Sequence, residues 1–253
     1  MPNNITNKIE FYGEQNNIDK VLELIKGEDS CIDFNKIIPM PESLNIESGS
    51  NTDNAIAYYV TERLTIPVKH TDLANLISNM FSKAWTYEVV SRVAQTAETA
   101  SIEELDKLYE MGKQYMFNRA NYGCYTWYEW CNRNWGTKWN AYSSYLDKEN
   151  NAIEFDTAWA CPFPVLDKLA EMCYENNVCF TGKWADEDTG YNVGVFESDC
   201  DGDEYWFSYE DVENASSEAY EIYVELKGKS CCLSKDADGN WVKHDCDNCP
   251  NPC

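Results

Sequence analysis

The segment IEFDTAWACPFPVLDKLAEMCYENNVCFTGKWAD, Ile153 to Asp186, carries the pattern that decides the fold class. At its start Ile153 and Phe155 alternate with acidic residues, which predicts a strand with one buried face. From Val165 to Met172 the apolar residues recur at helical spacing, which predicts an amphipathic helix. The closing VCFTGKWAD is typical of a strand. The segment therefore predicts a strand, a helix and a second strand in succession.

Two further strands extend this pattern toward the C-terminus. GYNVGVFES and EYWFSYED follow, and the connections contain Asp188, Gly190 and Gly202, which are residue types of tight hairpins. A helix is expected around residues 216–226. This order of elements resembles a split βαβ, or ferredoxin-like, arrangement.

The N-terminal part of the chain predicts elements of its own. Residues 5–11 alternate at strand period, apolar residues within 18–25 predict a helix, and residues 32–38 predict a second strand. Helical periodicity then runs over about residues 55–119, with a capping box formed by Ser101 and Glu104.

The expected fold class is therefore α+β. It consists of an N-terminal βαβ-type unit with a helical insertion, followed by a ferredoxin-like antiparallel sheet with helices on one face. The expected domains are an N-terminal α+β domain with a helical middle (1–145), a ferredoxin-like domain (146–228), and a Cys-rich C-terminal hairpin and tail (229–253).

Acidity dominates the composition. The 253 residues include 20 Lys and Arg against 44 Asp and Glu, a formal net charge of −24. Residues 151–253 alone carry 6 basic and 23 acidic residues, and no basic residue lies between Lys183 and Lys227. Such a charge repels phosphate backbones, so direct nucleic-acid binding is not expected, whereas a protein with a basic surface would be attracted. Solubility alone is the other reading of the same charge.

The sequence also bears on whether the protein is membrane-bound and in which cellular compartment it is found. No apolar run approaches the roughly 20 residues that span a bilayer, so no membrane segment is expected. The start, MPNNITNKIEFYG, lacks the basic and apolar regions of a signal peptide. We therefore expect a cytoplasmic protein whose cysteines are reduced or bind metal.

Three segments together resemble a known family. They are IDFNKIIPMPESL (Ile32–Leu44), WCNRNWGTKWNAY (Trp130–Tyr142) and IEFDTAWACPFPVLDKLAE (Ile153–Glu171). Over roughly residues 1–215 the chain resembles the YubB-type family of plasmid- and phage-encoded proteins. The resemblance implies a ferredoxin-like domain on the C-terminal side and an origin in a bacterial mobile genetic element. It implies no established activity and no catalytic residues.

The stretch from Tyr122 to Tyr145 is rich in Trp and Tyr. We favour a packed junction, because buried aromatic side chains contribute large apolar areas. The alternative is a small-ligand cleft with an aromatic floor and polar groups around it. The candidate ligand-binding residues are Trp127, Trp130, Asn134, Trp135, Lys138, Trp139, Asn140 and Asp156.

The cysteine-rich end offers candidate metal ligands. A C-x-x-C pair can hold one tetrahedral ion, and a hairpin upstream could return further thiolates, which is the chemistry of a structural zinc site. A frayed, thiol-rich tail is the other interpretation. The candidate ligands are Cys231, Cys232, His244, Cys246, Cys249 and Cys253.

Catalytic patterns do not emerge from the sequence. There are two histidines and no glycine-rich phosphate loop, so a non-enzymatic role is favoured and an unrecognised enzyme is an alternative. The favoured function is an acidic interaction protein of a bacterial mobile genetic element that binds a basic host-protein surface, in the manner of a DNA mimic. The predicted interaction surface comprises Asp186, Glu187, Asp188, Asp199, Asp201, Asp203, Glu204, Glu210 and Asp211.

Overall fold

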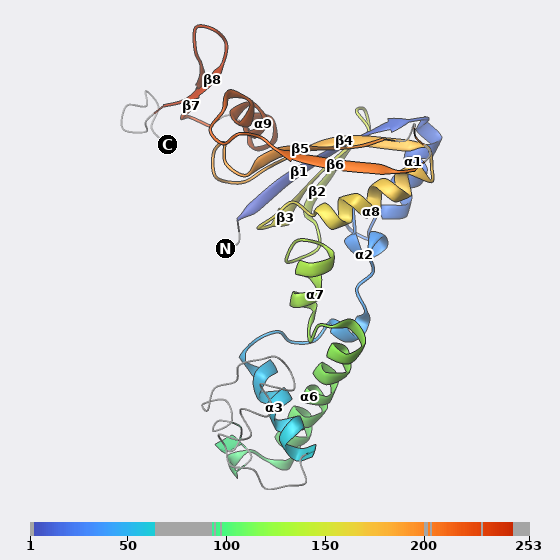
Figure 1. Ribbon diagram of the computed structural model, residues 1–253, viewed down its shortest axis with the longest axis vertical. Coiled ribbons are helices and arrows are strands. Elements are labelled where there is room, and N and C mark those ends of the chain that lie inside the picture. The colour runs from blue at the N-terminus through green and yellow to red at the C-terminus, as the bar shows by residue number, and fades with distance from the viewer. Residues whose placement is uncertain are drawn as a thin grey trace. The chain divides into compact units, whose positions relative to one another are not determined.

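The computed structural model describes residues 3–63, 93, 95–96, 98–199, 202, 204–228 and 230–244 of the chain. The chain forms two compact units (Figure 1). The first unit contains residues 1–39 and 131–253, and the second contains residues 40–130. The units therefore do not follow the expected division at residue 145, because the N-terminal segment belongs with the C-terminal half.

The first unit is built on a six-stranded sheet with strand order β2-β3-β1-β4-β5-β6. Every neighbouring pair in it is antiparallel. Its strands are β1 (Asn4–Gly13), β2 (Tyr142–Asp147), β3 (Ala152–Ala158), β4 (Val178–Ala185), β5 (Val193–Asp199) and β6 (Trp206–Asp211). Helix α1 (Gln15–Ile25) follows β1, α8 (Phe163–Tyr174) follows β3, and α9 (Ser217–Lys227) follows β6.

The connectivity of the first unit is ferredoxin-like. The elements β1, α1, β2, β3, α8 and β4 form a βαββαβ succession in which β1 lies between β3 and β4. The central strand therefore comes from the first residues of the chain, and residues 40–130 are inserted between α1 and β2. Strands β5 and β6 extend the sheet beyond β4.

The strand predicted over residues 32–38 is wrong. Residues Phe34–Ile37 form a short helix, α2, which is followed by the 3-10 helix η1 (Glu42–Leu44). The Asp33 side chain accepts a hydrogen bond from the Asn35 backbone N–H, which caps the first turn of α2. The predicted βαβ unit therefore does not form.

One face of the sheet is buried under α1 and α8, which supply Ile18, Val21, Leu166 and Leu169 to the core. On this face each of two glycines lies opposite a large ring. Gly182 pairs with Phe196 and Gly194 pairs with Trp184, and the two rings stack with centroids 6.3 Å apart. The glycines leave the space that these rings occupy.

Helix α9 packs against the other face of the sheet, at one end. Ala219, Ile222 and Leu226 contact the cluster that contains Ala185 and Val193. The helices are therefore not confined to one face, and the remainder of the second face is not covered by any described helix.

The second unit contains α3 (Ser50–Arg63) and α6 (Ile102–Tyr122), and α7 (Trp127–Asn134) leads out of it. The predicted capping box is confirmed, since Ser101 and Glu104 exchange hydrogen bonds at the start of α6. The predicted C-terminal hairpin is confirmed as β7 (Leu233–Lys235) and β8 (Trp241–Lys243). Within the described ranges, no helix is long and apolar enough to span a bilayer.

Candidate functional site

The side of the sheet opposite α1 and α8 carries alternating polar side chains beside α9. We call this surface the open face and define it by Lys8, Glu10, Thr181, Lys183, Glu197, Ser208 and Glu210, with Glu225 of α9 at its border. Strand register places these side chains together, because directly paired residues point to the same face of a sheet. They line a cavity of about 280 Å³, which is also bordered by Val195 and Tyr209.

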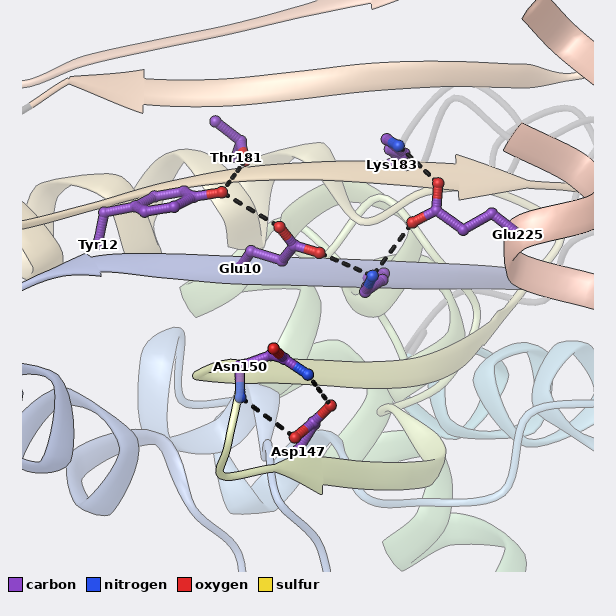
Figure 2. Close-up of polar contacts among 8 residues, drawn as sticks. Glu10, Tyr12, Asp147, Asn150, Thr181, Lys183 and Glu225 are labelled. Atoms are coloured by element: carbon purple, nitrogen blue, oxygen red, sulfur yellow. Dashed lines mark hydrogen bonds and ion pairs between the residues drawn. The ribbon is translucent and has the colours of Figure 1, made fainter. Parts of the chain in front are cut away.

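Glu225 bridges the two lysines of the open face (Figure 2). One carboxylate oxygen lies 3.1 Å from Lys8 Nζ, and the other lies 2.6 Å from Lys183 Nζ. Burial would raise the pKa of Glu225, but hydrogen bonds from Lys183 and Lys8 outweigh burial and lower it. Both lysines are therefore paired with one carboxylate of α9.

The network continues along β1. Lys8 Nζ lies 2.7 Å from Glu10, and the Tyr12 hydroxyl donates to Glu10 at 3.1 Å (Figure 2). The hydrogen bond from Lys8 lowers the pKa of Glu10 despite its partial burial. The Tyr12 hydroxyl also lies 3.2 Å from Thr181 Oγ1. These contacts fix the β1 side of the cavity.

Three more carboxylates lie on this side of the sheet, and none of them forms an ion pair within the described residues. Glu197 and Glu210 line the cavity and are exposed, and neither forms an ion pair with the described part of the chain. Glu154 pairs in register with Lys8 and points to the same side. Burial and then the charge of Asp156 raise the pKa of Glu154. The open face therefore has an excess of negative charge that its own lysines do not balance.

A second cavity, of about 770 Å³, lies between α1 and the β2–β3 hairpin. Gln15 and Asn151 join these elements by reciprocal side-chain hydrogen bonds of 3.1 and 3.2 Å. Its lining includes Lys26 and Glu23, which pair with each other, and Leu22. It offers no comparable group of carboxylates along adjacent strands.

Trp135 and Asn140, from the predicted aromatic cleft, have structural contacts. Trp135 is 3% exposed, its ring meets Phe34 edge to face at 5.7 Å, and its Nε1 donates to the Ile38 carbonyl. Asn140 accepts from the Phe34 backbone N–H at 2.8 Å and donates to Asp33 at 2.6 Å. Through these contacts both residues hold α2 against the rest of the first unit.

The other candidates of the cleft do not converge on one place. Asp156 accepts from Thr6 Oγ1 on the α9 side of the sheet, whereas its neighbour Phe155 packs on Phe34 in the core. Lys138 lies 4.5 Å from the centre of the Trp139 ring, which is 37% exposed. Trp127 and Trp130 belong to the second unit, and Asn134 is half-buried at the end of α7. Neither cavity described above is lined by any of the eight candidates.

The predicted acidic surface is divided among several places. Glu210 lies on the open face, and Asp199 points to the same side of the sheet, whereas Asp211 points to the opposite side. Asp186 is buried and accepts hydrogen bonds from Asn3 and Asn192, which gives it a structural role in the β4–β5 connection. The remaining predicted residues are Glu187, Asp188 and Glu204, which are exposed, and Asp201 and Asp203, which lie outside the described residues.

The predicted metal ligands are only partly described. Cys246, Cys249 and Cys253 lie outside the described residues. Cys231 is disulfide-bonded, and a sulfur in a disulfide is not available as a thiolate ligand. The His244 backbone N–H donates to the Cys232 carbonyl, and its ring contacts Ser234. No group of three metal-binding side chains occurs among the residues that the structure describes.

Sequence reasoning missed most of the open face. Lys8 and Glu10 occupy the polar positions of a strand that was predicted, and Lys183 and Glu197 occupy such positions in β4 and β5. The alternation of polar and apolar residues along each strand was the signal available in the sequence. It did not show that these strands are neighbours, or that α9 adds Glu225 from far along the chain.

A comparison with protein families agrees with the ferredoxin-like fold of the first unit. Residues 135–226 match a family model described as the ferredoxin-like domain in Api92-like protein. Among solved structures, the chain is similar to the protein api92 from Yersinia pseudotuberculosis at 11% identity and a TM-score of 0.38, covering 84% of this chain and 100% of that one. No curated protein matches the chain. The family match begins at Trp135 and so excludes β1, the central strand of the sheet.

Proposed function

We propose that this chain is an acidic, non-enzymatic interaction protein whose open face binds a basic segment of another protein. The observation that carries the proposal is the arrangement of charge around the cavity. Lys8 and Lys183 are paired with Glu225, so Glu197 and Glu210 are left to attract a cation from outside. A lysine or arginine side chain that entered the cavity would meet both carboxylates.

The charge of the whole chain supports a basic partner. At a net charge of −24 the protein attracts cationic surfaces over distances comparable to the Debye length, about 10 Å at 0.1 M salt. The same charge disfavours a nucleic acid on the open face, although ferredoxin-like sheets can bind single-stranded RNA on exposed aromatic strands. An origin in a mobile genetic element, which the resemblance of the sequence implies, would make a host protein the source of the basic segment.

An enzymatic role has less support. Burial raises the pKa of the Cys131 thiol to about 12, and burial also raises the pKa of Cys161 well above its ordinary value. Neither thiol would be a nucleophile near neutral pH. On the open face, the carboxylates lie beside lysines that are already paired. This arrangement suits binding of a cation better than catalysis.

A defined cationic peptide tests the proposal. The probe is an acetylated, amidated octapeptide of alternating Lys and Thr, and its affinity is measured by calorimetry at low and moderate salt. We expect binding that weakens with salt, because exposed charge pairs are screened. A Glu–Thr peptide of the same length should not bind.

Matched variants distinguish the open face from overall charge. Glu197→Gln with Glu210→Gln removes two charges from the cavity, and Glu28→Gln with Glu175→Gln removes two exposed charges on elements outside the open face. We expect the first pair to weaken binding by about two- to thirtyfold, since each of the two exposed ion pairs contributes about 0.2–1 kcal/mol, and the second pair to have much less effect. Equal losses in both variants would show that only net charge matters and would contradict the proposal.

A further inference from the structure

Among the described strands, β6 is paired on one side only. The sheet ends at β6, which pairs with β5 in unbroken register from Asp211 opposite Gly194 to Trp206 opposite Asp199. A regular edge strand presents a row of unpaired backbone N–H and C=O groups, to which another extended chain can pair.

The register shows which backbone groups point outward. The Val212 N–H donates to the Val193 carbonyl at 2.9 Å, so this pair and every second pair along the ladder are hydrogen-bonded pairs. Phe207, Tyr209 and Asp211 lie between these pairs and direct their N–H and C=O groups away from β5. These groups make no hydrogen bond to the described part of the chain.

The other edge of the sheet is less suited to pairing. The register of β2 with β3 shifts between Tyr142 and Tyr145, and Ser143 lies in the left-handed region with φ of 52°. Such an irregularity interrupts the row of outward groups and protects an edge from added strands. Strand β6 shows no such shift over its six residues.

Charge determines which chain the edge would accept. The sequence of β6, WFSYED, has Glu210 and Asp211 and no basic residue. Pairing two copies of the protein through β6 would bring four carboxylates together, whereas a basic strand would neutralise them. Trp206, on the same side of the sheet as Glu210, is 49% exposed, and its ring face can hold a cationic side chain.

We infer that a basic, extended segment of the partner binds as an additional strand along β6. This inference rests on the proposed function and specifies its geometry. Alternate side chains of the added strand would point to the open face beside Ser208 and Glu210, which border the cavity. Backbone hydrogen bonds would give affinity, and the carboxylates would select lysine or arginine at alternate positions.

N-methylated peptides test the strand pairing. In a ladder, every second residue of the added strand points its N–H at β6, so methylation of one alternate set of nitrogens removes hydrogen bonds and methylation of the other set does not. The Lys–Thr octapeptide is therefore compared with two analogues. One is methylated on the backbone nitrogens of its lysines, and the other on the backbone nitrogens of its threonines. We expect one analogue to lose about tenfold or more in affinity and the other to remain within about threefold of the parent.

The outcomes separate the two proposals. Equal affinity of the two analogues for the protein would overturn strand pairing, and the proposed function would still stand if Glu197→Gln with Glu210→Gln weakened the parent peptide. Failure of the parent peptide to bind at all would overturn both.

A backbone variant gives a second test on the protein itself. Asp211→Pro removes an outward N–H together with the charge, and Asp211→Asn removes the charge alone. Strand pairing predicts about fivefold weaker binding for Asp211→Pro than for Asp211→Asn, with similar melting curves. Equal binding by both variants would contradict a strand that pairs as far as Asp211.

Discussion

Replacing Gly182 with alanine should destabilise the sheet below the open face. An added Cβ at this position would lie 2.2 Å from the Phe196 ring and 2.4 Å from the Lys8 carbonyl oxygen. Phe196 is 2% exposed and stacks on Trp184, so its ring has no space into which to rotate. The Lys8 carbonyl belongs to the central strand β1, which is paired on both sides.

The size of the effect follows from these two contacts. Inserting a methyl group into a well-packed core costs about 1–3 kcal/mol and occasionally more. Because one of the two contacts is with backbone of the central strand, we expect the upper end of that range, about 3 kcal/mol. For a domain of 150–250 residues this corresponds to a fall in Tm of about 6–12 °C. The same displacement would move Lys8 and weaken binding of the Lys–Thr peptide.

Thermal unfolding followed by circular dichroism measures the change. Gly49→Ala is the matched control, because the nearest atom to its added Cβ is the flexible Glu47 carboxylate at 3.8 Å. The control should change stability by less than about 1 kcal/mol. If Gly182→Ala melted within about 2 °C of the parent protein, the packing of Phe196 against this glycine would be refuted.

Three further predictions concern residues around the candidate site and in the second unit. Glu154→Gln should raise stability at pH 7, and this gain should disappear toward pH 4 in pH-dependent denaturation. Burial raises the pKa of Glu154, so protonation of Glu154 stabilises the folded state as pH falls. A stability gain that does not depend on pH would contradict this. Ser101→Ala should cost about 1 kcal/mol in thermal unfolding by removing the cap that bonds Glu104, and Ser101→Asp should retain most of the stability. Asn140→Ala should cost about 1–3 kcal/mol, because it leaves the Phe34 N–H without its acceptor, and an unchanged Tm would return Asn140 to the list of ligand-binding candidates.

The charge pattern of the open face depends on residues from distant parts of the chain. Lys8 and Glu225 are separated by 217 positions, yet they form the ion pair that borders the cavity. Glu225 reaches the sheet because Ile222 and Leu226, on the same helix, pack on β4 and β5. Apolar packing of α9 therefore determines which of the acidic residues are neutralised and which are left to attract a partner.

The sequence by itself determined the local structure where a pattern was long and regular. The alternation in β1, β3 and β4, the helical spacing of α8 and α9, and the capping box of α6 were all predicted, and the structure confirms them. The prediction of a strand over residues 32–38 was wrong. Its apolar residues resemble a buried strand, but the cap supplied by Asp33 favours a helix. The formal charge and the absence of common catalytic motifs were likewise visible without coordinates.

Only the tertiary structure decided which strands are neighbours. Strand β1 pairs with β3 and β4 across more than 140 positions of sequence, and no local pattern encodes that partnership. The resulting register brings Lys8, Thr181 and Glu197 onto one face, and it leaves β6 as a regular outer edge. The physical reason is that alternation assigns a side chain to one of two faces of its own strand, whereas hydrogen bonding between distant strands and the packing of helices decide what each face meets.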